Sequence, residues 1–244
     1  MNLKYQLIGS FFNQRTKNEC HKVLIANNTY YKNLSEVNKK TFQIRTLVFL
    51  WTTNFSSERG FLLTNKMKII VSSAFVQITF GLKMNTLKKF NAIFIAPRSY
   101  SYKNNKALFN GDVNLYTKKV NLSWPAVAHG FEVSDDAMNL TIHEFGHCLI
   151  FENASNTYFS KVFEDKEFEN WKKQAAIKFQ KIKLKQNKVL RSYAGTNLIE
   201  LFSVALETFF EQPDFFEQHE PALYNSMTKL LKQDPRHKLN PIEK

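Results

Sequence analysis

The chain has 244 residues, of which 43% are apolar and 14% aromatic, which is enough to form one large domain with a real core. Its 7 glycines and 6 prolines are too few for a turn-rich all-β sandwich and favour helices. The net charge is +13, but no RNP-like, zinc-finger or glycine-rich phosphate motif accompanies it, so a lysine-rich solvated surface is favoured over nucleic-acid binding.

The two cysteines and the apolar segments indicate in which cellular compartment the protein is expected. Cys20 and Cys148 do not indicate a disulfide framework. Residues 1–12 lack the continuous apolar run of a signal peptide. Residues 67–82 lean apolar but are too short, and too often interrupted by polar side chains, to span a bilayer. We therefore expect a cytoplasmic protein without a membrane segment.

Residues 1–40 are polar and mixed, and we separate them from a domain that spans residues 41–244. This N-terminal segment is interpreted either as an appended helical segment or as a loosely packed arm. Within the domain, residues 42–51 are expected to form a packed helix. Residues 67–82 predict a buried helix, because the apolar run is too long for one strand.

Short strands are predicted next. Residues 90–96 are aromatic and β-branched, and Pro97 follows them, which is typical of a strand. Residues 110–112 (Asn-Gly-Asp) predict a turn, followed by a second, weaker strand through Leu115 and Tyr116. Residues 120–124 predict a third strand that Pro125 ends.

The rest of the chain predicts helices. Ser134 is a good N-cap, and Asp135 and Asp136 place negative charge in the first turn, so we expect a helix from Ser134 to about Glu152. Three further helices are expected after it: a lysine-rich amphipathic helix over residues 166–189, then residues 197–212 and residues 221–232. Helices with a small sheet indicate a mainly helical α+β domain.

The segment His143-Glu144-Phe145-Gly146-His147 lies on the first of these helices. Histidines four residues apart share one face of a helix, where both imidazoles can bind one metal ion. Glu144 then lies beside the metal, placed to take a proton from a water molecule whose pKa zinc lowers toward about 7. The flanking positions are uncharged, as a helix buried under an active site requires. The alternative is two histidines with satisfied hydrogen bonds in a core helix.

The remaining cysteine and histidine side chains are expected to be structural or solvated. Cys148 follows His147 and is turned by about 100° around the helix from it, so we interpret it as a packed thiol. His129 is conceivable as a ligand but lies in a Gly-flanked loop. The other histidines lie in polar stretches: His21, His219 and His237.

A third ligand is needed, because catalytic zinc keeps three protein ligands and one open position. The metzincin pattern is excluded, since Ile150 and Asn153 occupy the positions of its Gly and third His. The later helix offers Glu200 and Glu207, seven residues apart on a nearly all-apolar helix, where a carboxylate needs a partner such as a metal. An alternative role for Glu200 is to complete a capping box with Asn197. Spacing does not choose between the two glutamates.

Three segments follow one another along the chain: His143 to His147, then Ser-Tyr-Ala-Gly-Thr-Asn-Leu-Ile-Glu-Leu-Phe at residues 192–202, then Glu-Thr-Phe-Phe-Glu-Gln-Pro at residues 207–213. This order resembles the Mlc titration factor A family of bacterial zinc metallopeptidases. The Tyr-x-x-Thr-Asn-x-x-Glu run is also similar to one in the catalytic domain of anthrax lethal factor, a more distant relative in fold. The resemblance covers about residues 41–234 and is most specific around the ligand segments.

The resemblance implies a zincin-like fold with a gluzincin-like ligand set, in which Zn²⁺ is bound by His143, His147 and Glu200, and Glu144 is the general base. It places the Tyr193 hydroxyl near the metal, as a donor to the oxyanion; without the family, Tyr193 is interpreted as a packed aromatic residue before a helix. Glu207 becomes a candidate for holding a ligand histidine in one tautomer.

One departure from the family concerns the acid that usually follows the second histidine. The segment here reads Cys-Leu-Ile-Phe at residues 148–151, without that acid, and Glu152 is a candidate to substitute for it.

The resemblance implies hydrolysis of a peptide or protein substrate, with aminopeptidase-like activity. It also implies a regulatory protein partner, because one family member binds a transcriptional repressor, but nothing in this sequence adds to that. One alternative is a non-catalytic zinc-containing binding or regulatory module that uses the basic residues between 172 and 191. Another is a structural-zinc or metal-free domain.

Overall fold

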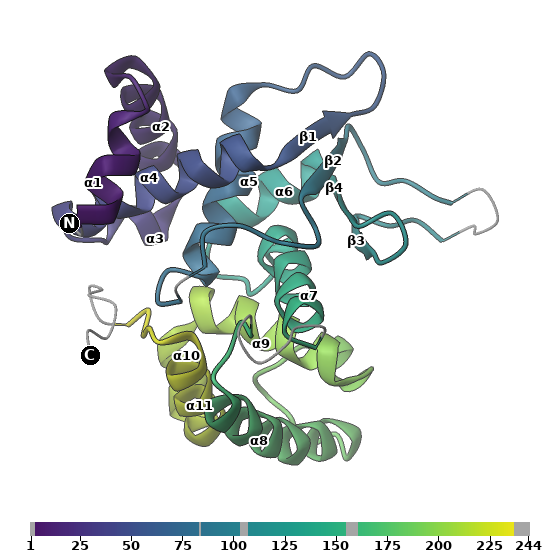
Figure 1. Ribbon diagram of the computed structural model, residues 1–244. Coiled ribbons are helices and arrows are strands. Elements are labelled where there is room, and N and C mark those ends of the chain that lie inside the picture. Colours follow the sequence, from purple (N-terminus) through teal and green to yellow (C-terminus); the bar gives the residue numbers. More distant parts are fainter. Residues whose placement is uncertain (1–2, 83, 103–106, 155–160, 237–244) are drawn as a thin grey trace.

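The computed structural model describes residues 3–82, 84–102, 107–154 and 161–236 (Figure 1). The helices and strands follow in this order: α1 (Leu3–Ser10), α2 (Gln14–Asn27), α3 (Thr29–Lys32), α4 (Glu36–Thr52), β1 (Asn54–Ser57), α5 (Asn65–Ile78), β2 (Ala92–Ala96), β3 (Gly111–Asn114), β4 (Lys119–Ser123), α6 (Trp124–Glu132), α7 (Leu140–Ala154), α8 (Asp165–Lys183), the 3-10 turn η2 (Ser192–Gly195), α9 (Leu198–Glu211), α10 (Pro213–His219) and α11 (Pro221–Leu231).

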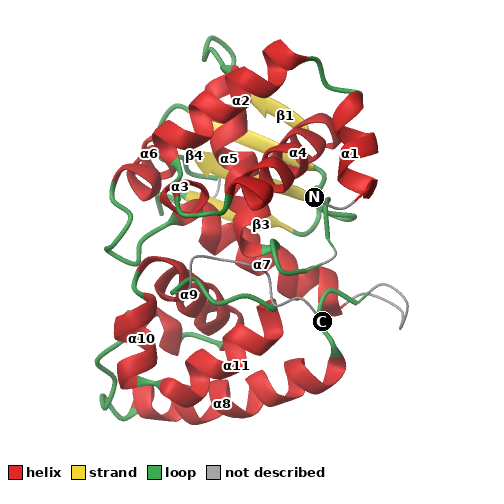
Figure 2. Cartoon of the chain, turned by 90° about the vertical axis from the view of Figure 1, so that its left-hand side faces the viewer, coloured by secondary structure: helices red, strands yellow, loops and turns green. Residues whose placement is uncertain are grey.

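Within the described residues, the strands form one four-stranded mixed sheet in the order β1-β2-β4-β3. β1 pairs parallel with β2 and β2 parallel with β4, whereas β3 pairs antiparallel with β4 and forms an edge. The sheet and the N-terminal helices occupy one half of the molecule, α8 to α11 occupy the other half, and α7 lies between them (Figure 2). The prediction of a mainly helical α+β domain with a small sheet is confirmed.

The predicted helices agree with the structure except near their ends. α4 contains the predicted helix over residues 42–51, and α5 covers residues 67–78 of the helix predicted to reach residue 82. α9 begins after Asn197, whose side chain accepts hydrogen bonds from the backbone N–H groups of Ile199 and Glu200. α8 ends earlier than predicted, because the chain turns at Lys185, which has a left-handed φ of 58°. Local capping and turn residues therefore set these ends.

The predicted strand through Leu115 and Tyr116 is wrong in its position. The strand is β3, which uses the predicted turn residues 111 and 112, and Leu115 and Tyr116 lie in the following turn. The Asn114 side chain makes this turn by accepting hydrogen bonds from the N–H groups of Tyr116 and Thr117 at 3.1 and 2.9 Å. Turn chemistry at an asparagine thus outweighs the Asn-Gly signal.

The predicted helix start at Ser134 is also wrong. α6 ends at Glu132, and α7 begins only at Leu140. Ala137 between them has a left-handed φ of 56°, which no helix continues through. Asn139 is the residue that caps α7: its side-chain oxygen accepts from the Ile142 N–H at 3.2 Å. Likewise, Trp124 begins α6 rather than ending the predicted third strand, and Pro125 lies in the first turn of that helix.

Residues 3–40 form α1 to α3 and the start of α4. Cys20, Leu24 and Tyr31 from this segment are buried in the same core as the rest of the chain. The Tyr30 ring contacts the ring of Phe210 on α9, and its hydroxyl donates to Gln233 at 2.6 Å. We propose that the segment folds together with the remainder rather than as a separate unit.

An aromatic cluster supports the central helix from the sheet side. Phe145 of α7 meets Phe49 of α4 and Phe75 of α5 edge-on, and the latter two rings stack at a centroid distance of 4.2 Å. Such ring pairs add about 0.5–1.5 kcal/mol each beyond the area that they bury. Among the described helices, none is long and apolar enough to cross a bilayer.

Candidate metal centre

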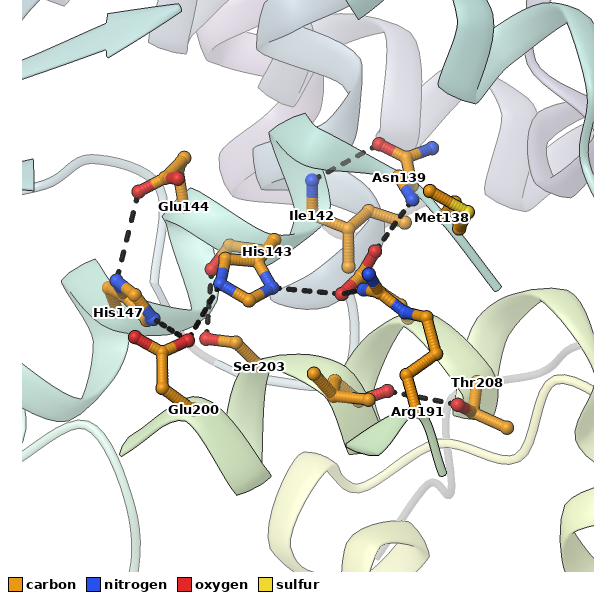
Figure 3. A network of polar contacts seen from close by, with 12 residues as sticks. Met138, Asn139, Ile142, His143, Glu144, His147, Arg191, Glu200, Ser203 and Thr208 are labelled. Atoms are coloured by element: carbon orange, nitrogen blue, oxygen red, sulfur yellow. Dashed lines mark hydrogen bonds and ion pairs between the residues drawn. The ribbon is translucent and has the colours of Figure 1, made fainter. Parts of the chain in front are cut away.

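Two histidines and one glutamate converge where α7 packs against α9 (Figure 3). Nε2 of His143 lies 3.0 Å and Nε2 of His147 lies 3.2 Å from the same oxygen, Oε2 of Glu200. The three candidate ligand atoms all lie within 4.8 Å of one another. In the described part of the chain, no other group of three or more His, Cys, Asp or Glu side chains is close enough to hold a metal ion.

Helix geometry brings these side chains together. His143 and His147 lie one turn apart on α7, with ring centroids 4.7 Å apart. Glu200 lies in the first turn of α9, where the cap at Asn197 fixes the start of the helix. Burial raises the pKa of the Glu200 carboxyl, but its hydrogen bonds to both histidines outweigh burial and hold that pKa well below its usual range. Glu200 is therefore an ionised acceptor between two imidazoles.

Glu207 binds the other side of the His143 ring. Its Oε1 lies 2.8 Å from Nδ1 of His143 and 2.5 Å from Nη2 of Arg191, and its Oε2 accepts from the Asn139 N–H at 2.7 Å. Burial lowers the pKa of His143, but the hydrogen bonds to Glu200 and Glu207 outweigh it and raise that pKa to about 10. With Nδ1–H donated to Glu207, Nε2 is the nitrogen left for a metal.

Glu144 is buried, with 4% of its surface exposed. Its carboxylate lies beside the three candidate ligands, His143, His147 and Glu200, which are called the ligand cluster below. Its Oε2 lies 3.7 Å from Nδ1 of His147. Burial raises the pKa of the Glu144 carboxyl to about 8. A Cβ placed on Gly111 of β3 would lie 2.9 Å from Oε1 of Glu144, so any larger residue at this position would displace the Glu144 side chain.

Tyr193 lies at the mouth of the site. Its ring centroid lies 6.0 Å from that of His143, and 51% of the residue is exposed. Burial of part of the ring, the charge of Glu200 and a hydrogen bond to Glu200 raise the pKa of Tyr193 above its ordinary value. The hydroxyl is therefore a protonated donor at neutral pH.

The other histidines make contacts away from this cluster. His129 lies 3.8 Å from Asp136, His21 bonds the Tyr31 hydroxyl, and His219 bonds the Phe215 carbonyl. His237 lies outside the described residues.

Two further side chains from the sequence predictions also lie apart from the ligand atoms. Cys148 is fully buried as a free thiol. Glu152 is buried at the other end of α7 and accepts from the Lys89 N–H at 2.6 Å, which connects it to the loop before β2.

A cleft of about 600 Å³ opens beside His143 and Glu144. Its walls come from the segment that leads into β3, from α6, from the start of α7 and from the segment around η2. The lining residues are Leu108, Phe109, Asn110, Gly111, Pro125, Ala126, His129, Met138, Leu140, His143, Glu144, Arg191, Tyr193 and Glu207. The cleft joins an apolar wall to the ligand cluster.

Three residues of this region escaped the sequence predictions. Arg191 ion-pairs with Glu207, Asn139 both caps α7 and binds Glu207, and Ser203 donates to the His143 carbonyl at 2.9 Å. In the sequence, Arg191 is one of the basic residues between 172 and 191 that favour the alternative of a basic binding module. The one signal available was the position of Arg191 two residues before Tyr193.

Comparisons with known proteins identify the family of the chain. Residues 8–232 match the family described as glucose-regulated metallo-peptidase M90. The chain is 22% identical to an uncharacterised protein of Synechocystis sp. over 84% of this chain and 80% of that protein. It is 22% identical to Mlc titration factor A of Serratia proteamaculans (76% of each chain) and 27% identical to Mlc titration factor A of Yersinia pestis (48% of this chain, 45% of that protein). The chain therefore belongs to the M90 family of metallopeptidases.

Proposed function

We propose that this protein hydrolyses peptide bonds with one zinc ion held by His143, His147 and Glu200. The observation that carries the proposal is the shared approach of both histidine Nε2 atoms to one oxygen of Glu200, at 3.0 and 3.2 Å. Tetrahedral zinc with bonds of about 2.0–2.1 Å needs ligand atoms separated by about 3.3 Å. The residues present therefore fit the ion, and their number leaves one coordination position open.

Zinc, when bound, would supply Lewis acidity toward the substrate carbonyl and lower the pKa of a water molecule. Glu144 is the residue of this chain that we assign to proton transfer. Burial raises its pKa to about 8, and a bound cation would lower it again, so that the carboxylate would be ionised and ready to accept a proton. The same group can then donate that proton to the leaving amine.

Glu207 and Tyr193 have supporting roles in this proposal. Glu207 keeps the His143 ring oriented with Nδ1–H as donor, which leaves Nε2 free for the metal. Tyr193 offers a protonated hydroxyl at the mouth of the site, and this hydroxyl is a suitable donor to the charge that develops on the scissile carbonyl oxygen.

The edge strand β3 offers a way to hold an extended substrate. β3 pairs with β4 on one side, and its Gly111 lies against Glu144. An extended peptide can add to such an edge by main-chain hydrogen bonds, with alternate side chains pointing into the cleft. We propose that the substrate lies along β3, which brings its backbone next to the general base.

Two finer expectations from the resemblance receive different support. Aminopeptidase-type cleavage calls for an acidic group to bind the substrate amine, and the carboxylates among the described cleft-lining residues are Glu144 and Glu207, which both have other roles. We therefore propose peptide-bond hydrolysis without an amino-terminal requirement. The name Mlc titration factor A belongs to the relatives, and we do not extend the regulatory protein partner to this chain.

The alternative of a basic binding module draws little support from α8. Lys178 is buried in an ion pair with Glu220 at 2.7 Å, and Lys172 pairs with Glu169 at 2.6 Å. Two of the lysines on this helix are therefore paired with glutamates of the protein itself, which does not favour a concentrated basic patch for an anionic partner.

Substitution of Glu144→Gln tests the proposal. The variant should bind zinc with unchanged stoichiometry and lose about 10²–10⁴-fold in the cleavage rate of a peptide mixture, because the base is lost while the ligands stay. Glu132→Gln, an exposed glutamate at the end of α6, is the matched control. Zinc content by mass spectrometry and cleavage by chromatography give the two readouts. Parental cleavage rates in Glu144→Gln would overturn the proposed mechanism.

A further inference from the structure

Arg191 is a cation that the proposed chemistry does not use, and it lines the same cleft. It lies just before η2 and enters between the start of α7 and α9 (Figure 3). Its Nη2 contacts Oε1 of Glu207 at 2.5 Å, and 35% of its side chain is exposed. Its Nε is buried without a hydrogen-bond partner among the described residues. Because part of the side chain is exposed at the wall of the cleft and Glu207 contacts Nη2, the rest of the exposed guanidinium can donate further hydrogen bonds to a ligand there.

The carboxylates of the cleft do not satisfy those donors. Glu207 already accepts from His143, Arg191 and the Asn139 backbone, and Glu144 lies beside the ligand cluster. Of the two histidines among the described cleft-lining residues, His143 is held by Glu200 and Glu207, and His129 lies 3.8 Å from Asp136. The cleft therefore combines an apolar wall with a guanidinium that can donate hydrogen bonds to an anionic ligand. A carboxylate matches the planar fork of arginine donors best.

We propose that Arg191 binds a carboxylate of the peptide substrate; this inference rests on the proposed function of the site. Nη2 of Arg191 and Nδ1 of His143 contact the same oxygen of Glu207, at 2.5 and 2.8 Å, and Nε2 of His143 lies on the far side of the imidazole ring. That span corresponds to about two residues of extended chain. The recognised carboxylate therefore belongs to a residue within about two positions of the scissile bond. It is either the C-terminal carboxylate or the side chain of an aspartate or glutamate.

The apolar wall strengthens this recognition. Leu108 and Met138 line the cleft and expose much of their surface to it or to solvent. An ion pair that forms against such a wall is less screened by water than one on an open surface. A substrate with an apolar residue beside its carboxylate is thus the chemistry that the cleft fits.

Direct binding to zinc-loaded Glu144→Gln protein separates recognition from turnover. N-acetyl-Ala-Phe-Leu with a free carboxylate is compared with its carboxamide by calorimetry, and N-acetyl-Ala-Phe-Glu carboxamide with its Gln counterpart. We expect one acid of the two pairs to bind about tenfold tighter or more than its neutral partner, since hydrogen bonds to charged groups are the strong ones. The pair that responds tells a terminal carboxylate from a side-chain carboxylate.

Adding Arg191→Gln to this protein should remove the preference for the acid and leave the affinity for the neutral peptide within about threefold. Arg191→Lys should keep part of the preference, because it retains the charge but not the fork. Lys188→Gln, an exposed residue on the same segment, changes the net charge equally and should leave the preference intact.

Equal affinities for acid and neutral peptide in the parent would overturn the inference. So would an acid preference that survives in Arg191→Gln, since the metal itself would then bind the carboxylate. Zinc content is checked in every variant. Failure of the proposed function has a different signature: the wild-type protein would bind no zinc or cleave no peptide, whatever the peptide's charge.

Discussion

Gly146 of α7 lies directly against Ser203 of α9, and this contact sets how closely the two helices that carry the proposed ligands approach. A Cβ added at Gly146 would lie 2.7 Å from Oγ and 3.2 Å from Cα of Ser203. Ser203 cannot easily move away, because it is fully buried and its hydroxyl donates to the His143 carbonyl at 2.9 Å. The glycine within the histidine motif is therefore a packing residue for the helix that carries Glu200.

Gly146→Ala should destabilise the protein and weaken metal binding together. Overpacking at such a contact costs about 1–3 kcal/mol, and pushing α9 outward moves Glu200 away from both histidines. Thermal unfolding and a zinc titration measure the two effects. Gly9→Ala is the control, because its Cβ would meet only the flexible end of Ile44, and alanine is otherwise the better helix former. Unchanged zinc affinity in Gly146→Ala would contradict this account.

Glu200→Ala and Glu207→Gln should have different effects on zinc. The first removes a proposed ligand, so stoichiometric zinc should be lost after dialysis. The second keeps the shape of the side chain but weakens its hold on His143, and such a change typically lowers metal affinity by about 10–100-fold. Competition with a chromophoric chelator gives both affinities. If Glu207→Gln lost zinc and Glu200→Ala retained it, the ligand assignment would be reversed.

Tyr193→Phe should lower kcat with little change in KM or in zinc content. The hydroxyl is proposed to act on charge that develops in the transition state, and removal of such a donor costs up to about 10²–10³-fold. Because the residue is half exposed, we expect a smaller loss, at about tenfold. Steady-state kinetics on one cleavable peptide make the measurement, with the exposed Tyr116→Phe as control. A rise in KM at constant kcat would instead indicate ground-state binding.

Glu211→Gln should stabilise the protein at high pH. Burial, together with the charges of Glu207 and Asp136, raises the pKa of the Glu211 carboxyl from its ordinary value of 4.5 to about 8. The folded state therefore holds this proton more tightly than the unfolded state. The stabilisation is complete below about pH 4.5 and is lost as the pH rises through about 8.

The pH dependence of the melting temperature tests this direction. The melting temperature of Glu211→Gln minus that of the parent should grow between about pH 5 and pH 9, at constant ionic strength and saturating zinc. Glu132→Gln, an exposed glutamate, should show no such trend. A constant difference across this range would mean that Glu211 does not titrate differently in the two states.

Sequence reasoning worked best where the information is local. His143 and His147 share one helix face because of their spacing, and Asn197 begins α9 because an asparagine side chain caps a helix efficiently. The start of α7 is different from the predicted start at Ser134, because Asn139 caps the helix instead. The left-handed turn at Ala137 decides between them, and nothing in the residue type of Ala137 predicts it.

The histidine motif, the apolar helix that carries two glutamates and the predominance of helices follow from the sequence by itself, because spacing and composition depend on neighbours along the chain. Only the tertiary structure decides that Glu200 lies against both Nε2 atoms, while Glu207 lies behind His143 with Arg191. Two glutamates seven residues apart lie on one face of a helix, so their roles depend on how α9 is placed along α7. That placement is set by packing between distant segments, above all where Gly146 meets Ser203.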